Sequence, residues 1–466
     1  MPLVSLSDCI EAKMLLRTIF DSFAPPSGFP CAPRALPLLG HFPLLYDDAL
    51  TLLRESAEAV GPVFWVSFGL GRWYLFCIGT ESIDLMRLPC VGTEGAYDDL
   101  DLVAGQSVIR KNDPHHYKMR TVLNPSFSPR GLAQHDVGRI MARVVAERVA
   151  RWIGVKRIQV LKETLGLTLD NVFHALGIPT QDLPVWHSQY RDFALGLYPI
   201  AVMLPGFPRY RAAKARRWLD EQLRVLLAKS RNNSANQGVM SALAMARDEN
   251  GEPLSEQELI DNLRLLLFAG HETTAGAMAW ELISLAQHPE WWTALCSEVR
   301  GKSEVRIPES IQEAKEFPCA EAIFREVLRL NPPTWFMFRK THEPITYRER
   351  LIPTGTSIAI SLGLLNRDPA VFHQPERFDP SRWLERQVLT SAVAFSPFGI
   401  GPHYCLGYNI AWLESVQVLV GLAIAASQAG LAPRLADHAL PRQRYFPLGH
   451  PSSSTCLVFS GQRQSH

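Results

Sequence analysis

The sequence lacks an excess of charge of either sign. Its 466 residues include 47 Lys and Arg and 46 Asp and Glu, which gives a formal net charge of +1. Domains that bind nucleic acid normally carry a basic surplus that neutralises phosphates. The balanced charge therefore argues against nucleic acid as a partner.

Closely spaced cysteine pairs are also absent. The eight cysteines stand singly, and no CxxC motif occurs. Zinc ribbons and redox dithiols need such pairs, and disulfide frameworks belong mostly to small secreted domains. These classes are excluded, and we expect a reducing, cytoplasmic compartment.

The first 24 residues contain no long apolar run. A bilayer-spanning helix needs roughly 20 apolar residues, whereas this segment carries charges from Asp8 through Asp21 in an order unlike that of a signal peptide. We therefore expect residues 1–24 not to be transmembrane, and no integral membrane anchor. The most apolar stretch elsewhere, Val416–Ala426, reads as a buried core helix.

Long helical patterns dominate the rest of the chain. Ser255 and Glu258 form a capping box that starts one helix, and His288-Pro289 ends it after Gln287. Such a helix has roughly 32 residues and a length of about 48 Å. Short strand-like runs cover 63–68 and 73–78. We predict a mainly α fold with a small β-rich region, forming a single domain over residues 25–466.

The segment around Cys405 carries the clearest chemical signal. Three glycines lie in the ten residues from Phe398 to Gly407, so the backbone can turn tightly and approach a ligand closely. A helical pattern begins at Tyr408, and a helix N-terminus favours an anionic thiolate. From these residues alone, Cys405 is either a metal ligand or a buried cysteine beside a glycine turn.

This segment resembles the haem-binding signature of the cytochrome P-450 family. The matching residues are Phe398, Gly399, Gly401, His403, Cys405, Gly407, Ala411 and Glu414. The resemblance implies haem b as cofactor, with Cys405 as the axial ligand of the iron. It also implies the family's single triangular helical domain with a small β-rich region.

A second motif joins Glu326 and Arg329, which share a helical face at i,i+3. Arg377 follows in Pro375-Glu376-Arg377-Phe378. By resemblance, Glu326, Arg329 and Arg377 form a buried ion-pair network that supports the haem loop.

A third motif lies in the middle of the long helix, from Ala269 to Thr274. It resembles the family's oxygen-activation motif, an acid followed by a threonine. The resemblance implies that Glu272 and Thr273 are catalytic and relay protons, and that Ala269 and Gly270 contact the haem. His271 is interpreted as a packed or surface histidine.

A set of basic residues resembles the family's contacts with the haem propionates. His116 and Arg120 share a helical face at i,i+4, and arginine is well suited to pairing with a carboxylate. Arg339 and His403 match two further contacts, so all four are expected to bind the cofactor. Taken singly, each of them could equally be a surface charge.

The resemblance implies a monooxygenase that inserts one atom of dioxygen into a hydrophobic substrate, such as a terpenoid, steroid, fatty acid or polyketide-like compound. Electrons would come from a separate ferredoxin, flavodoxin or reductase, because the chain leaves no room for a flavin module. We expect substrate-facing residues in 97–103, 263–267, 335–338 and 445–448. Two alternatives stay open: a peroxygenase or isomerase/dehydratase that needs no electron donor, and a non-catalytic haem sensor or carrier. The intact Glu272-Thr273 pair favours the monooxygenase.

Overall fold

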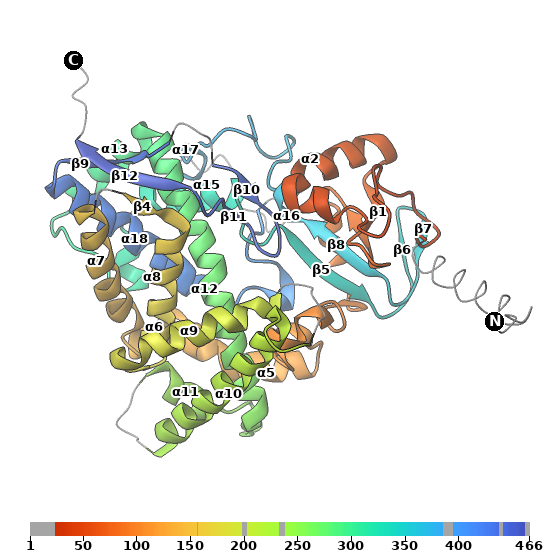
Figure 1. The fold of residues 1–466 in the computed structure, drawn as a ribbon, viewed down its shortest axis with the longest axis horizontal. Helices are drawn as coiled ribbons and strands as arrows, with labels where there is room; N and C mark the ends of the chain where they lie inside the picture. The colour runs from red at the N-terminus through yellow and green to blue at the C-terminus, as the bar shows by residue number, and fades with distance from the viewer. Residues whose placement is uncertain are drawn as a thin grey trace, which may run out of the picture.

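The computed structural model describes residues 24–155, 157–197, 203–232, 238–384, 395–437 and 441–461. Helices make up most of it, and a strand-rich region with helix α2 (Phe42–Val60) lies to one side, as Figure 1 shows. The mainly helical fold with a small β-rich region is what the sequence predicts. Residues 1–23, most of the segment expected not to span a membrane, lie outside the described residues.

The main sheet has five strands in the order β1-β2-β8-β5-β3. Only the β2–β8 pair is parallel. Alternate side chains of the first strand enter two cores: Phe64 and Val66 pack on the α2 side, and Val63 and Trp65 pack on the other. The strands are β1 (Val63–Ser67), β2 (Trp73–Cys77), β3 (Val91–Gly92), β5 (Phe336–Thr341) and β8 (Ser357–Ser361).

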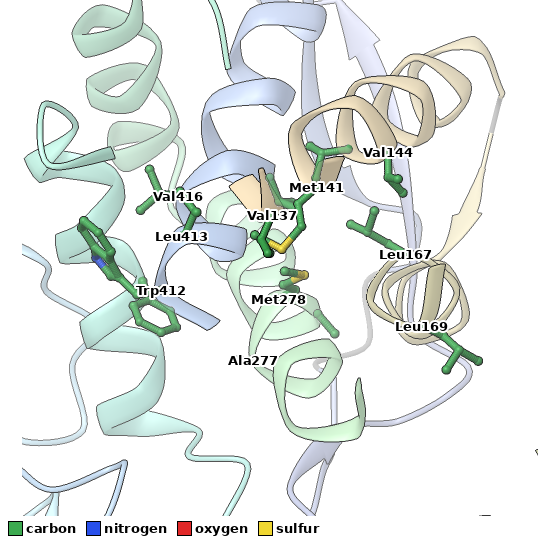
Figure 2. Packing of buried hydrophobic residues seen from close by; sticks show 14 of the residues in the cluster. Val137, Met141, Val144, Leu167, Leu169, Ala277, Met278, Trp412, Leu413 and Val416 are labelled. Atoms are coloured by element: carbon green, nitrogen blue, oxygen red, sulfur yellow. The ribbon is translucent and has the colours of Figure 1, made fainter. Parts of the chain in front are cut away.

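The helical region surrounds α12 (Glu256–Gln287), which begins at the predicted Ser255–Glu258 capping box. Its middle is packed by α8 (Val160–Ala175), and α7 (Val137–Gly154) and α18 (Tyr408–Gln428) complete the core. Figure 2 shows Met141 of α7, Met278 of α12 and Leu413 of α18 converging in this core.

Shorter elements frame these two regions. The helices are α3 (Ser82–Leu85), α4 (Asp101–Ala104), α5 (His115–Phe127), α6 (Pro129–Gln134), α9 (Leu183–Ala194), α10 (Pro208–Asn232), α11 (Val239–Met245), α13 (Pro289–Arg300), α14 (Ile311–Ala314), α15 (Pro318–Leu330), α16 (Leu362–Leu365) and α17 (Ser381–Leu384). The 3-10 turns are η1 (Asp98–Leu100), η2 (Val108–Arg110), η3 (Thr180–Asp182), η4 (Leu195–Leu197) and η5 (Gly401–His403). The small sheets contain β4 (Ile158–Gln159), β12 (Cys456–Gly461) and β9 (Leu431–Leu435), then β6 (Ile345–Tyr347) with β7 (Arg350–Ile352), and β10 (Gln443–Arg444) with β11 (His450–Pro451).

Within the described residues, one helix is long and apolar enough to cross a membrane. This is α18, and 72% of its most apolar window is buried inside the protein. Since its side chains pack against α7, α13 and α15, α18 is a core helix, as its sequence predicts.

Candidate active site

A cavity of about 490 Å³ lies between the helical region and the main sheet. Residues of α12 form one wall, the loop before α18 forms the floor, and β5 with the 446–448 segment forms the opposite wall. Most of its lining is apolar or aromatic, which suits a hydrophobic ligand. The polar groups are few, so the position of each of them matters.

The Cys405 loop presents its sulfur to this cavity. The loop is closed by a hydrogen bond from the Cys405 N–H to the Phe398 carbonyl, at 2.9 Å. Gly399 and Gly401 have φ values of +77° and +66°, which side-chain-bearing residues rarely adopt. These two glycines therefore allow the turn that carries the sulfur into the cavity.

Opposing effects act on the Cys405 thiol. Burial raises its pKa, whereas the N–H groups of Gly407 and Tyr408 donate to the sulfur and, with the charge of Arg120, lower the pKa. Burial is the largest of these effects, so the pKa of the thiol is raised overall. A metal cation bound to the sulfur would deprotonate it outright. Cys405 thus lines the cavity with two N–H donors directed at its sulfur, an arrangement that fits an axial metal ligand.

Four basic side chains gather at the cavity floor: His116, Arg120, Arg339 and His403. The rings of His116 and His403 lie 4.0 Å apart between centroids. Burial, together with His116 and both arginines, lowers the pKa of His403 to about 3. Among the described lining residues, Asp99 is the only acid, and it pairs with Arg72, which is not part of this cluster. A cluster of this kind fits a ligand that carries carboxylates, such as the two propionates of haem.

The α12 wall brings Ala269, Gly270, Thr273 and Thr274 to the cavity. The Thr273 hydroxyl donates to the Ala269 carbonyl at 2.6 Å. Glu272 does not line the cavity; its Oε1 atom lies 3.5 Å from Nδ1 of His271. The threonine therefore faces the reaction space, and the acid lies behind it.

His271 is a packed residue rather than a ligand. Its Nε2 atom lies 2.9 Å from the Leu165 carbonyl, and its ring makes an edge contact with Tyr190. The side chain is buried between α12 and α8, as the sequence interpretation expects.

Behind the Cys405 loop, Glu326 and Arg329 form a fully buried bidentate pair, with both N–O distances 2.8 Å. The sequence prediction of the third member, Arg377, is wrong. The Arg377 guanidinium is exposed and contacts Gln374, while its backbone carbonyl accepts a hydrogen bond from Arg329 at 2.9 Å.

Arg382 replaces Arg377 in the network, with its Nε atom 3.2 Å from Oε1 of Glu326. The physical reason is the path of the chain: the 375–379 loop turns the carbonyls of Pro375 and Arg377 toward Arg329, while the Arg377 side chain lies outward. The short helix α17 then points Arg382 and Trp383 inward, and the Trp383 indole N–H donates to Glu326 at 3.0 Å. The Arg382-Trp383 pair after Pro380 was the sequence signal for this residue.

Two further buried carboxyls were not assigned a role from the sequence. Asn171 donates to Glu414 at 2.7 Å, and Ser415 donates to Glu281 at 2.5 Å. Burial raises the pKa of Glu281 to about 7, and burial with the nearby Glu281 charge raises the pKa of Glu414 to about 8. Asn171 and Ser415 line the cavity, and each donates to one of these carboxyls. Glu414 and Glu281 therefore lie directly behind the cavity wall.

One turn of α12 also fixes the cavity wall formed by residues 103–108. Arg264, which is fully buried, donates to the Val103 carbonyl at 3.1 Å and pairs with Asp220 of α10. Asp261 accepts from the Gln106 N–H at 2.8 Å. The next residue, Asn262, likewise accepts from the Val108 N–H at 2.9 Å. Polar side chains of α12 thus form the hydrogen bonds to the main chain of 103–108 that a neighbouring β-strand could otherwise provide.

The four predicted substrate-facing regions all contribute to the lining. Leu263 and Tyr445, however, are buried in the hydrophobic cores instead. The lining residues from these regions are Tyr97, Asp99, Leu100, Val103, Leu265, Leu266, Leu267, Trp335, Phe336, Met337, Phe338, Phe446, Pro447 and Leu448.

Comparisons with known proteins agree with this geometry. A family model described as Cytochrome P-450 matches residues 194–422. The chain is 35% identical to the cytochrome P-450 BJ-4 homolog of Sinorhizobium fredii, over 92% of this chain and 96% of that one. It is 29% identical to the cyclooctat-9-en-7-ol 5-monooxygenase of Streptomyces melanosporofaciens, over 84% and 88%.

The fold itself is similar to that of a retinoic acid-bound cyanobacterial structure, CYP120A1. The TM-score is 0.80 at 21% identity, and the match covers 94% of this chain and all of that one. This likeness confirms the fold class predicted from the sequence.

Proposed function

This chain belongs to the cytochrome P-450 family, and on that premise we propose that it inserts one oxygen atom from dioxygen into a terpenoid-like substrate. The observation that carries the proposal is that Cys405, at the floor, and Thr273 of α12 line the same largely apolar cavity. A hydrophobic substrate held in this cavity would lie between the α12 wall and the metal site at Cys405.

The described residues fit a haem b in named roles. Cys405 would bind the iron, and Ala269, Gly270, Phe398 and Gly407 would lie against the ring. His116, Arg120, Arg339 and His403 would bind the propionates. When bound, the haem supplies the iron centre for dioxygen reduction, and thiolate ligation favours O–O cleavage.

Thr273 and Glu272 have the chemistry of a proton relay. A hydroxyl both accepts and donates a hydrogen bond, so Thr273 can take a proton from the protein side and release it into the cavity. Glu272 lies on that side, beside His271. An apolar cavity excludes bulk water, which makes delivery by fixed side chains necessary.

The substrate class and the electron donor complete the proposal. Curated relatives include a cyclooctat-9-en-7-ol 5-monooxygenase and a pentalenene oxygenase, which supports a terpenoid-like substrate among the classes expected from the sequence. We propose a separate ferredoxin, flavodoxin or reductase as the electron donor. The cytoplasmic location stays a prediction.

The test begins with the reduced carbon monoxide complex. Wild-type protein is expected to show the red-shifted Soret band of a thiolate-ligated haem, and Cys405→Ala to lose it, while Cys90→Ala, which changes a cysteine outside the cavity, keeps it. An unchanged spectrum in Cys405→Ala would refute the assignment of the ligand.

Turnover then separates the alternatives. With a surrogate reductase system, labelled dioxygen and a terpenoid substrate, the product is expected to carry one labelled atom. Product formed from hydrogen peroxide alone, or from the substrate without any donor, would favour the peroxygenase or isomerase reading. Binding without turnover under every condition would favour the sensor or carrier.

A further inference from the structure

The end of the cavity next to the β1–β2 hairpin is walled by aromatic rings. Tyr74 packs against Phe68 and Phe338, with ring centroids 4.6 and 5.1 Å apart. Phe446 continues the wall at 5.9 Å from Phe68, and Tyr97 lies 6.2 Å from Phe338. All five rings line the cavity. This end therefore suits the apolar body of a ligand.

A charged pair lies at the rim of the same wall. Arg72, in the turn between β1 and β2, has its Nη1 atom 2.9 Å from Oδ2 of Asp99, and both residues line the cavity. The other lining arginines in the described chain, Arg120 and Arg339, belong to the basic cluster on the floor. Arg72 is thus the lining arginine that the haem site does not use.

The guanidinium of Arg72 has donors to spare. In the described part of the chain its side chain makes one hydrogen bond, through Nη1 to Asp99, whereas a guanidinium carries five N–H donors. Its remaining edge can bind a carboxylate in the bidentate geometry that arginine favours. Tyr74 lies within electrostatic reach of both Arg72 and Asp99, because each of them shifts the pKa of its hydroxyl. That hydroxyl offers a further donor.

The pair favours an anionic ligand over a cationic one. The Arg72 side chain is 35% exposed, whereas that of Asp99 is 61% exposed and open to solvent. An exposed ion pair of this kind contributes little to stability, so a second carboxylate can share or replace Asp99 at a small cost. The less exposed group of the pair is therefore the cation.

We infer that Arg72 binds the carboxylate of an amphipathic substrate, whose apolar body lies along the aromatic wall toward the Cys405 floor. The inference rests on the proposed function of the same cavity and narrows its substrate to a hydrophobic carboxylic acid. The ligand would enter with its apolar end toward the floor and its carboxylate at the rim.

The experiment uses the haem-loaded protein and a series of isoprenoid carboxylic acids, each compared with its methyl ester, with dehydroabietic acid as the polycyclic member. Binding is measured by the spectral shift of the ferric haem. At least one acid is expected to bind roughly tenfold more tightly than its ester, because a charge-assisted hydrogen bond is lost in the ester. Raising the salt concentration is expected to weaken binding of the acid alone.

Three variants sharpen the test. Arg72→Gln is expected to bind the acid as weakly as the ester, and Asp99→Asn to bind the acid more tightly, because a competing carboxylate is removed. Ester affinity stays unchanged in both. Arg348→Gln, which alters an exposed arginine paired with Glu81 away from the cavity, is the matched control and leaves both affinities unchanged.

Two results would overturn the inference: no acid preferred over its ester in the series, or an acid preference that survives Arg72→Gln. Failure of the proposed function is recognised separately. It would appear as an absent thiolate-type carbon monoxide spectrum or as no oxygenated product from any ester, whereas the carboxylate inference can fail while esters are still oxygenated.

Discussion

The Nε atom of Arg382 lies 3.2 Å from Oε1 of Glu326, and both side chains are buried. Glu326 is therefore flanked by two arginines, Arg329 from its own helix and Arg382 from α17. The backbone N–H of Asp379 and the indole of Trp383 fill its remaining acceptor positions. The Glu326 carboxylate thus links α15 to residues 379–383, in the region behind the Cys405 loop.

Replacing either of two nearby arginines tests this arrangement. Arg382→Ala is expected to destabilise the protein by roughly 3–5 kcal/mol, because it leaves a buried carboxylate partly unpaired. Arg377→Ala, the matched control, removes only an exposed side chain and is expected to change stability by less than about 0.5 kcal/mol. Urea unfolding and the haem content of the purified proteins measure both. Equal losses in the two variants would contradict the assignment of Arg382.

Thr273 and Thr274 both line the cavity, but about 100° of helix rotation separates them. If Thr273 delivers protons, Thr273→Ala is expected to keep consuming reduced cofactor while product falls and hydrogen peroxide rises. A loss of about 10- to 100-fold in product per electron pair fits the usual contribution of a proton-transfer group. Thr274→Ala is expected to retain most of the coupling. A similar ratio of product to cofactor in wild type and Thr273→Ala would argue against the relay.

The carboxyls of Glu281 and Glu414 predict a stability that depends on pH. Both hold their protons more tightly in the folded protein, with pKa values of about 7 and about 8 against 4.5. The folded state is therefore expected to lose stability as pH rises from about 4.5 to about 8, and to lose little more above that range. The two groups interact, so they titrate as a pair.

Glu414→Gln tests this directly, because the amide oxygen can still accept the hydrogen bond from Asn171. The variant is expected to be more stable than wild type at pH 8.5 by a few kcal/mol, on the order of the 1.36 kcal/mol per pKa unit that burial costs. Near pH 4.5 the difference is expected to vanish. Glu290→Gln, an exposed control, leaves the pH profile unchanged. Parallel profiles for wild type and Glu414→Gln would show that the carboxyl is ionised without penalty.

Gly105 occupies a position that a larger residue does not fit. Its φ is +53°, and an added Cβ would lie 2.5 Å from both Nη2 of Arg264 and Cγ of Asp261. Gly105→Ala is expected to cost roughly 1–3 kcal/mol and to change the spectral response to substrates. Gly154→Ala, where nothing lies within 4 Å, is the control and is expected to be neutral or slightly stabilising. Thermal unfolding and substrate titration distinguish the two.

Local sequence signals predicted the elements that depend on local interactions. The capping box at Ser255 fixed the start of α12, and the glycine loop placed Cys405 before α18, because caps and positive-φ turns are determined within a few residues. Arg377 failed because two arginines five residues apart fit the same pattern. The Trp383 that follows Arg382, and that also donates to Glu326, was the local signal that distinguishes the inward arginine.

Long-range partners were beyond the sequence in the same way. Nothing local links Arg264 to Asp220 or Asn171 to Glu414, since each pair joins helices far apart in the chain. The haem-facing roles of the predicted site residues, and the extent of a single domain over 25–466, stay predictions.

The turn of α12 that contains Asp261, Asn262 and Arg264 allows two kinds of substitution to be made separately. One kind changes the side chains that line the cavity, and the other changes the path of the main chain that carries them. Because Asp261, Asn262 and Arg264 hold the main chain of 103–108, the cavity-lining side chains of Val103 and Val108 can be exchanged while the main chain of this wall stays in place. An engineered library that varies those side chains and leaves the three polar residues of α12 intact would therefore sample different cavity shapes on one unchanged main chain. A library that varies the three polar residues instead would change the path of the 103–108 main chain, and most of its members would lose the pocket altogether.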